Sequence, residues 1–294
     1  MIKSLLAASV TACLAAGTAD AATLLSHFTF DNDLTTNQVA GRDALGAVGA
    51  SLDNSESAVG GGSVLFDGGS TAEYVVAGTN AVPNDQEAFY SATVALWFKA
   101  GQGLTVGSRA LMGATNGNPA TFGADDRTAF LLETDGSGKL RVFIRAHDGS
   151  ETNNRLRFGH LSSDPLEYLE WADGDWHHLA YSWDIDSTGL LGVNMWLDGV
   201  PLPTSVQENT LENDPIKNLP KPWEHPGIFI GAQNNRSGQG GGPSGNVNGW
   251  IDDLRVYEGV LSDGEVAALA ALPEPASLAL LSLGGVALLG RRRS

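Results

Sequence analysis

Apolar and polar residues alternate over short segments of this chain, and residues that favour turns separate these segments. The clearest case is residues 92–99, in which Val94, Leu96 and Phe98 fall on one side of the alternation. A period of two places such residues on one face of a β-strand. Similar segments recur at residues 24–30, 63–66, 73–76, 128–134, 140–146, 176–183, 191–197, 227–232 and 250–257. The pattern therefore predicts an all-β domain.

Turns rich in glycine and aspartate join these segments. Residues 135–138 and residues 184–189 each separate two strand-like segments, which predicts two β-hairpins. Helical periodicity is absent until residues 261–272, where Ser262 and Glu265 have the spacing of a capping box. Many short strands without strand–helix alternation predict a two-sheet antiparallel sandwich, followed by one short helix.

The N-terminal end has a different pattern. Lys3 precedes an apolar run over residues 4–17, and small residues lie near the position before Ala22. This is the layout of a secretory signal peptide covering residues 1–21. The same region also fits a loose lipobox in which Cys13 would carry a lipid, although its apolar run would be short. Cleavage before Ala22 would leave a mature protein without cysteine, and hence without disulfides or thiol chemistry.

The C-terminal end contains a second apolar run, over residues 276–290, which predicts a short hydrophobic helix. A run of this length is marginal for a bilayer, which takes about 20 residues. Basic residues after it favour the cytoplasmic side of a membrane. A buried core helix is the alternative, but such a helix is rarely apolar all round. We expect the exported protein to be held briefly in the inner membrane by this segment.

The C-terminal end resembles the PEP-CTERM sorting signal of Gram-negative bacteria. The residues that carry this resemblance are Pro273, Glu274, Pro275, Arg291, Arg292 and Arg293, on either side of the apolar run. The resemblance implies recognition by an exosortase, a membrane protease, and transfer to the cell surface or the extracellular matrix.

Composition narrows the classes of function. The formal charge of the chain is −17, with 34 acidic and 17 basic residues. Binding of nucleic acid or anionic lipid requires clustered lysine and arginine, so both partners are excluded for the body of the chain. The acidic balance suits a surface protein or one that holds divalent cations.

Four motifs resemble the LamG-like jelly-roll domains, in the order that this family has. They are residues 92–99, 174–180 (Gly-Asp-Trp-His-His-Leu-Ala), 195–199 (Met-Trp-Leu-Asp-Gly) and 249–257 (Gly-Trp-Ile-Asp-Asp-Leu-Arg-Val-Tyr). The resemblance implies a concanavalin A-like sandwich. The predicted organisation is a signal peptide (1–21), a LamG-like domain (22–260), a short helix or linker (261–272) and a sorting segment (273–294). This fold hosts both binding proteins and enzymes.

The sequence argues against catalysis. Glucanases of this fold carry Glu-x-Asp-x-x-Glu or Glu-x-Asp-x-Glu on one strand, and the chain contains neither. Glu167 and Glu170 are three residues apart in a predicted connection, where solvated carboxylates are expected. His177 and His178 are adjacent on a strand and point to opposite faces, so we expect packed histidines rather than a shared ligand site.

A single structural calcium ion is the metal that the sequence favours. Calcium takes six to eight oxygen ligands, which an acidic and cysteine-free protein can supply. Related folds hold such an ion between the N-terminal segment, an early turn and the closing strand. The resemblance implies Asp31, Asp67 and Asp252 as ligands here. The alternative is that these aspartates cap turns and bind no ion.

Loop residues supply the candidate carbohydrate site. Trp171 and Trp223 lie in predicted loops and could stack on sugar rings. Asn234, Asn235 and Arg236 precede a glycine-rich loop and could form a polar rim. The alternative for each tryptophan is packing against the edge of the sandwich.

We therefore expect an exported, surface-sorted and non-catalytic binding module for extracellular polysaccharide or a surface protein of the matrix. Two alternatives remain open at this point. One is a polysaccharide hydrolase or lyase of the same fold whose site has no recognisable motif. The other is a structural protein of the matrix without a discrete ligand.

Overall fold

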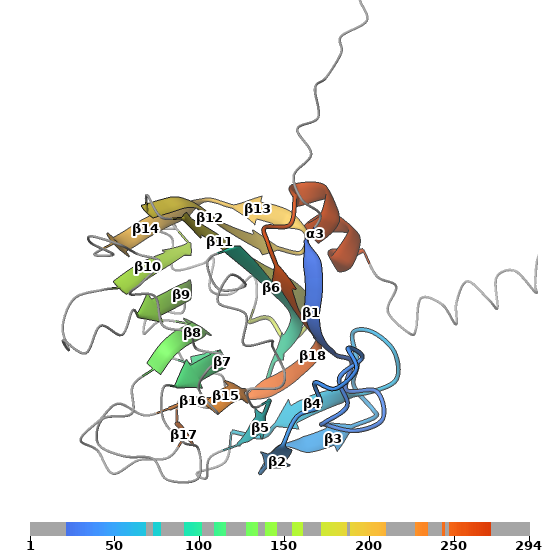
Figure 1. The fold of residues 1–294 in the computed structure, drawn as a ribbon. Helices are drawn as coiled ribbons and strands as arrows, with labels where there is room; N and C mark the ends of the chain where they lie inside the picture. Colours follow the sequence, from blue (N-terminus) through green and yellow to red (C-terminus); the bar gives the residue numbers. More distant parts are fainter. Residues whose placement is uncertain are drawn as a thin grey trace, which may run out of the picture.

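Two antiparallel β-sheets face each other in the computed structural model of the chain (Figure 1). The described residues are 22–68, 73–77, 91–101, 109–115, 128–134, 139–145, 155–160, 172–186, 189–209, 227–234, 243–244 and 247–271. The arrangement confirms the predicted sandwich.

The first sheet contains the closing strand of the domain. Its order is β13 (Val200–Leu202), β12 (Gly189–Leu197), β11 (Trp176–Asp186), β6 (Ser91–Ala100), β18 (Gly249–Glu258), β4 (Ser63–Phe66) and β3 (Ser51–Asp53). In addition, β1 (Thr23–Phe28) pairs with the second half of β18, beyond the end of β4.

The second sheet has eight strands as well. Its order is β14 (Thr204–Asn209), β10 (Arg155–His160), β9 (Leu140–Arg145), β8 (Thr128–Thr134), β7 (Arg109–Thr115), β15 (Gly227–Ile230), β5 (Tyr74–Val76) and β2 (Gly46–Val48). A separate pair is formed by β16 (Gln233–Asn234) and β17 (Pro243–Ser244).

The core lies between the two sheets. Val94, Leu96 and Phe98 of β6 all belong to it, which confirms the alternation predicted for this strand. In β11 the residues at alternate positions, such as Leu179 and Tyr181, meet them from the neighbouring strand. Burial of this apolar face is the main stabilising term in a domain without crosslinks.

One short helix, α3 (Asp263–Ala270), covers part of the outer face of the first sheet. Ser262 and Glu265 form the predicted capping box: the Ser262 hydroxyl accepts from the Glu265 backbone N–H, and the Glu265 side chain accepts from the Ser262 N–H. Val266 is buried against Ala95 and Trp196. The helix thereby fixes the end of the domain against the sheet.

The sequence predicted most of the strands within a few residues, but it missed β7, β10 and β14, which have six or seven residues each, as well as the shortest strands. The two strands of one predicted hairpin are longer than expected: β11 reaches Asp186 and β12 begins at Gly189. Strands β2, β3, β16 and β17 have two or three residues each, too few for an alternating pattern.

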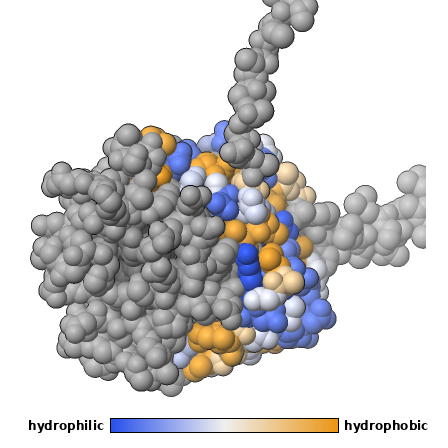
Figure 2. Space-filling model, in the orientation of Figure 1, coloured by the Kyte–Doolittle hydropathy of each residue, from blue (hydrophilic) through white to orange (hydrophobic). Residues whose placement is uncertain are grey.

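The two predicted terminal segments, 1–21 and 273–294, lie outside the described residues, as does the expected hydrophobic helix at 276–290. No helix within the described ranges is long and apolar enough to cross a bilayer. Hydrophilic and hydrophobic residues are interspersed over the surface coloured in Figure 2.

Candidate functional site

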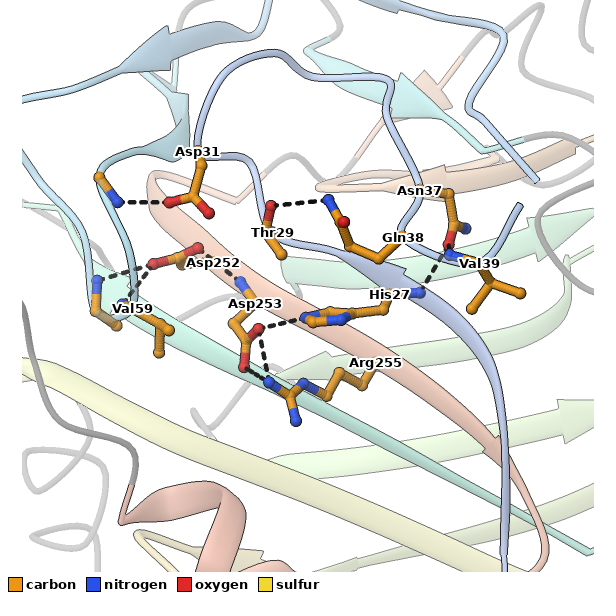
Figure 3. Close-up of polar contacts among 12 residues, drawn as sticks. His27, Thr29, Asp31, Asn37, Gln38, Val39, Val59, Asp252, Asp253 and Arg255 are labelled. Carbon is orange, nitrogen blue, oxygen red and sulfur yellow. Dashed lines mark hydrogen bonds and ion pairs between the residues drawn. The ribbon is translucent and has the colours of Figure 1, made fainter. Parts of the chain in front are cut away.

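The closing strand β18 carries the polar residues that organise the N-terminal loops (Figure 3). Asp252 pairs with Trp97 of β6, and Arg255 pairs with Ala95, so the β18 segment holds one extra residue. Asp253 has a φ of 46°, in the left-handed region that few residues other than glycine adopt. This β-bulge directs the side chains of Asp252 and Asp253 to different neighbours.

Asp252 is fully buried and accepts three backbone hydrogen bonds. One carboxylate oxygen, Oδ2, accepts from the N–H groups of Ala58 and Val59, each at 2.9 Å, and Oδ1 accepts from the Asp253 N–H at 2.7 Å. Burial nevertheless raises the pKa of Asp252 to about 7, because these bonds only partly offset the loss of hydration. A buried carboxylate of this kind favours a nearby cation.

Asp31 binds the same loop from the other side. Its Oδ1 accepts from the Gly61 N–H, three residues beyond Ala58 (Figure 3). The structure thus brings Asp31 and Asp252 to one loop, residues 54–62, while their binding of calcium stays a prediction. It places Asp67 elsewhere: Asp67 follows β4 at the end where Phe66 pairs with Gly249.

Three oxygen atoms converge beside Gly62 in this loop. A β-carbon built on Gly62 would lie 2.8 Å from Asn54 Oδ1, 2.8 Å from the Phe30 carbonyl oxygen and 3.1 Å from the Asp31 carbonyl oxygen. Phe30 is buried with a φ of 52°, a costly conformation that turns its carbonyl into this cluster. We call Asn54, Phe30 and Asp31 the oxygen cradle.

The oxygen cradle has the donor chemistry of a calcium site. Calcium prefers carbonyl, amide and carboxylate oxygens. The cradle offers two backbone carbonyls and an amide oxygen, with the Asp31 and Asp252 carboxylates in the same loop region. Among the described residues, no three side chains of His, Cys, Asp or Glu lie together in a way that could hold a metal ion. Asp31 and Asp252 are thus not part of a carboxylate cluster, and a calcium ion here would be held largely by the backbone and amide oxygens of the cradle.

A second polar network lies one residue further along β18. His27 Nε2 lies 2.6 Å from Asp253 Oδ1, and the Arg255 guanidinium lies 3.0 Å from Asp253 Oδ2 (Figure 3). Burial works to raise the pKa of Asp253, but the bond from His27 and the charge of Arg255 lower it overall. This network ties β1 to β18, so the carboxylate has a structural role.

His177 and His178 point to opposite faces, as predicted. His177 Nδ1 lies 2.8 Å from Asp198 Oδ2 and its Nε2 lies 3.1 Å from Asp173 Oδ1. His178 is 2% exposed, and its ring packs edge-on against Trp97. His177 is thus held by two carboxylates and His178 by packing, while the buried Nδ1 of His178 has no hydrogen-bond partner among the described residues.

Most of the predicted carbohydrate site falls outside the described residues. This holds for Trp171, Trp223, Asn235 and Arg236, while Asn234 lies in the short strand β16. Sequence reasoning missed Asn54 and the carbonyl of Phe30, because only the fold brings them to Gly62. The sequence did contain one indication of this loop. Three consecutive glycines, at 60–62, are typical of a place where another backbone segment approaches closely.

Solved structures with a similar fold include binding domains and enzymes. The receptor-binding domain of a botulinum neurotoxin of mosaic serotype C/D has a TM-score of 0.53 at 12% identity over 84% of this chain and 50% of that one. A Trypanosoma rangeli sialidase mutant with trans-sialidase activity has a TM-score of 0.51 at 16% identity, over 84% of this chain and 32% of that one. This chain thus spans half or less of either protein, and the likeness shows the fold alone.

Another similar structure is domain 4 of a GH43 extracellular arabinanase from Geobacillus stearothermophilus, in complex with arabinotriose. It has a TM-score of 0.43 at 17% identity, over 85% of this chain and 98% of that one. No curated protein sequence matches the chain. Residues 67–267, which run from the end of β4 into α3, match one protein family. The chain belongs to this family, the laminin G-like domains of the concanavalin A-like lectin/glucanase superfamily.

Proposed function

We propose that this protein is an exported, non-catalytic binding module that recognises extracellular polysaccharide. The family and the fold are compatible with binding and with catalysis, so support for binding is sought in the carboxylates. A glycosidase needs two carboxyl groups facing its substrate, about 5–10 Å apart. The proposal depends on how the buried carboxylates of this chain are used.

The buried carboxylates of the described residues all take part in structural bonds. Asp252 accepts three backbone N–H groups, and Asp253 binds His27 and Arg255. Glu133 of β8 pairs with Arg141 of β9, its cross-strand neighbour, with 2.8 Å between Arg141 Nε and Glu133 Oε1. Glu73 accepts from the Gly68 N–H at 3.2 Å. Carboxylates committed in this way support binding rather than acid–base catalysis, and this observation carries the proposal.

Calcium is part of this proposal. The oxygen cradle and the carboxylates of Asp31 and Asp252 would hold the ion, and its positive charge would offset the burial of Asp252. The ion would fix the loop at residues 54–62 to the closing strand. Its role would be structural, since two of the cradle ligands are backbone carbonyls.

Export and sorting complete the proposal. Residues 1–21 would be removed as a signal peptide, and an exosortase would process residues 273–294 after they had held the protein in the inner membrane. The position of the ends supports this: Ala22 packs in the cluster formed by Leu261 and Val266, so β1 and α3 lie side by side (Figure 1). Both processing sites would then be at one side of the domain.

Binding and catalysis are separated by one experiment on purified protein. A polysaccharide panel is probed for retained protein, and reducing ends are measured in the same samples. We expect retention without a rise in reducing ends. A rise would establish the hydrolase alternative, while absence of retention on every polysaccharide would favour a purely structural protein.

Sorting has its own test. Intact mass and location of the protein are measured in a Gram-negative host with an exosortase and in the matched strain lacking it. We expect loss of both terminal segments and release to the surface only in the first strain. An unprocessed C-terminus in both strains would contradict the sorting proposal.

A further inference from the structure

Three side chains form a row across the first sheet. Trp176 of β11 pairs with Lys99 of β6, and Lys99 pairs in turn with Trp250 of β18. The neighbouring residues Phe98 and Ile251 point into the core between the sheets. Because side chains alternate along a strand, Trp176, Lys99 and Trp250 all point to the outer face. We call them the outer-face row.

The outer-face row is partly exposed. Trp176, Lys99 and Trp250 are each partly exposed, unlike Trp97, which lies on the same face two residues from Lys99 and is 6% exposed. Helix α3 covers a different part of this face, around Ala95. Two partly exposed indoles thus lie on the outer face of the sheet, away from its covering helix.

Trp250 is held in one orientation. Its Nε1–H donates to Asp53 Oδ2 at 2.9 Å, and the Lys99 ammonium lies 5.5 Å from the centre of its ring. Lys99 is itself fixed by Glu56, with 2.8 Å between Nζ and Oε2. A side chain held in advance loses little rotamer freedom when a ligand binds.

The spacing and chemistry of the row suit sugar rings. Trp176 and Trp250 are two strands apart, which is about 10 Å at the usual spacing of strands. Indole faces attract the C–H groups of a pyranose ring. The carboxylate of Asp53 lies beside Trp250 and that of Glu56 beside Lys99, where they could accept from hydroxyl groups. The charge of −17 disfavours a polyanionic ligand.

We propose that the outer-face row is a stacking platform for a neutral polysaccharide chain, with Trp176 and Trp250 contacting separate sugar units. This inference rests on the proposed function and adds the surface and the ligand class. It differs from the loop tryptophans that the sequence singled out, because the platform is built on three adjacent strands.

The test uses the full chain and a panel of soluble neutral polysaccharides, namely a β-glucan, a galactomannan and an arabinan, with alginate as a polyanion. Trp176→Ala and Trp250→Phe are compared with Leu45→Ala, which removes a side chain that is 64% exposed before β2 in the other sheet. We expect Kd for the bound neutral polysaccharide to rise about fivefold or more in Trp176→Ala. Leu45→Ala should leave it unchanged.

Trp250→Ala is measured as a further variant. Trp250→Phe keeps an aromatic face and loses the bond to Asp53, so it should bind more weakly than the parent and more tightly than Trp250→Ala. Urea unfolding of each variant identifies those that remain folded. Equal affinity of folded Trp176→Ala and the parent would overturn the platform while leaving the binding function intact. Preferred binding of alginate would overturn the neutral ligand class. Absence of all polysaccharide binding by the parent would overturn the proposed function itself.

Discussion

Two adjacent histidines have opposite effects on acid stability. Burial lowers the pKa of His178 to about 4, from an ordinary value of 6.5. Burial also works to lower the pKa of His177, but its bonds to Asp198 and Asp173 outweigh that effect and raise it overall. Because neighbouring residues of a strand point to opposite faces, these two adjacent histidines have pKa values shifted in opposite directions.

His178 is predicted to weaken the fold in acid. Between pH 6.5 and 4 the unfolded chain binds a proton at this residue and the folded protein does not, so the free energy of unfolding falls as pH falls. The full effect is about 3 kcal/mol. His178→Phe, which keeps a ring beside Trp97, should remove this loss. Urea unfolding at several pH values between 4 and 7.5 measures it.

The control is His177→Asn. Because the pKa of His177 is raised, this variant should have a lower free energy of unfolding in acid, the opposite of the change expected for His178→Phe. His177 stabilises the fold below pH 6.5, and its contribution is lost as pH rises through its raised pKa. If His178→Phe loses stability in acid as steeply as the parent protein, the buried neutral histidine is not the cause.

At the scale of elements, the contact between β18 and β6 depends on a glycine. Gly249 has a φ of 143°, and a β-carbon there would lie 2.1 Å from the Lys99 carbonyl oxygen. Backbone cannot move aside as a flexible side chain can. Gly249 thus allows β18 to enter the sheet next to the outer-face row.

Gly249→Ala should lower the free energy of unfolding by about 3 kcal/mol, through the clash and the strained φ. Urea unfolding provides the measurement. Gly192→Ala in β12 is the matched control, because a β-carbon on Gly192 meets nothing within 4 Å. Equal stability of the two variants would show that β18 does not approach β6 as closely as described.

Calcium binding would also depend on the contact between two segments, because the oxygen cradle joins the segment after β1 to the loop after β3. We expect calcium to raise the melting temperature of the parent protein relative to chelator. Asn54→Ala removes one cradle oxygen and should reduce that rise. Scanning calorimetry in calcium and in chelator measures both.

Asp33→Ala is the control for this experiment. Asp33 caps its own turn through Thr35 and Thr36 and contributes nothing to the cradle, so the calcium effect should persist in this variant. If calcium does not change the melting temperature of the parent protein, the protein holds no structural calcium ion.

At the scale of the whole molecule, alternation and turn residues were sufficient to predict the sandwich. The run at 92–99 became β6 because three apolar residues at alternate positions bury one face of the sheet. The capping box at Ser262 was predictable because a local spacing encodes it.

The site was predictable only in part. Asp252 and Asp31 were found from the resemblance, and they meet at one loop. Asp67 does not join them, because it lies at the opposite end of β4. The outer-face row was not found from the sequence, because the pairing of three distant strands, and no local pattern, places Trp176 and Trp250 on either side of Lys99.

Binding of polysaccharide without cleavage is the central claim. Its most direct measurement is titration calorimetry of the purified protein with the retained polysaccharide, followed by the chain-length distribution of that polysaccharide from light scattering. We expect saturable binding and an unchanged chain length. Shortened chains, or no heat of binding with any neutral polysaccharide, would contradict it.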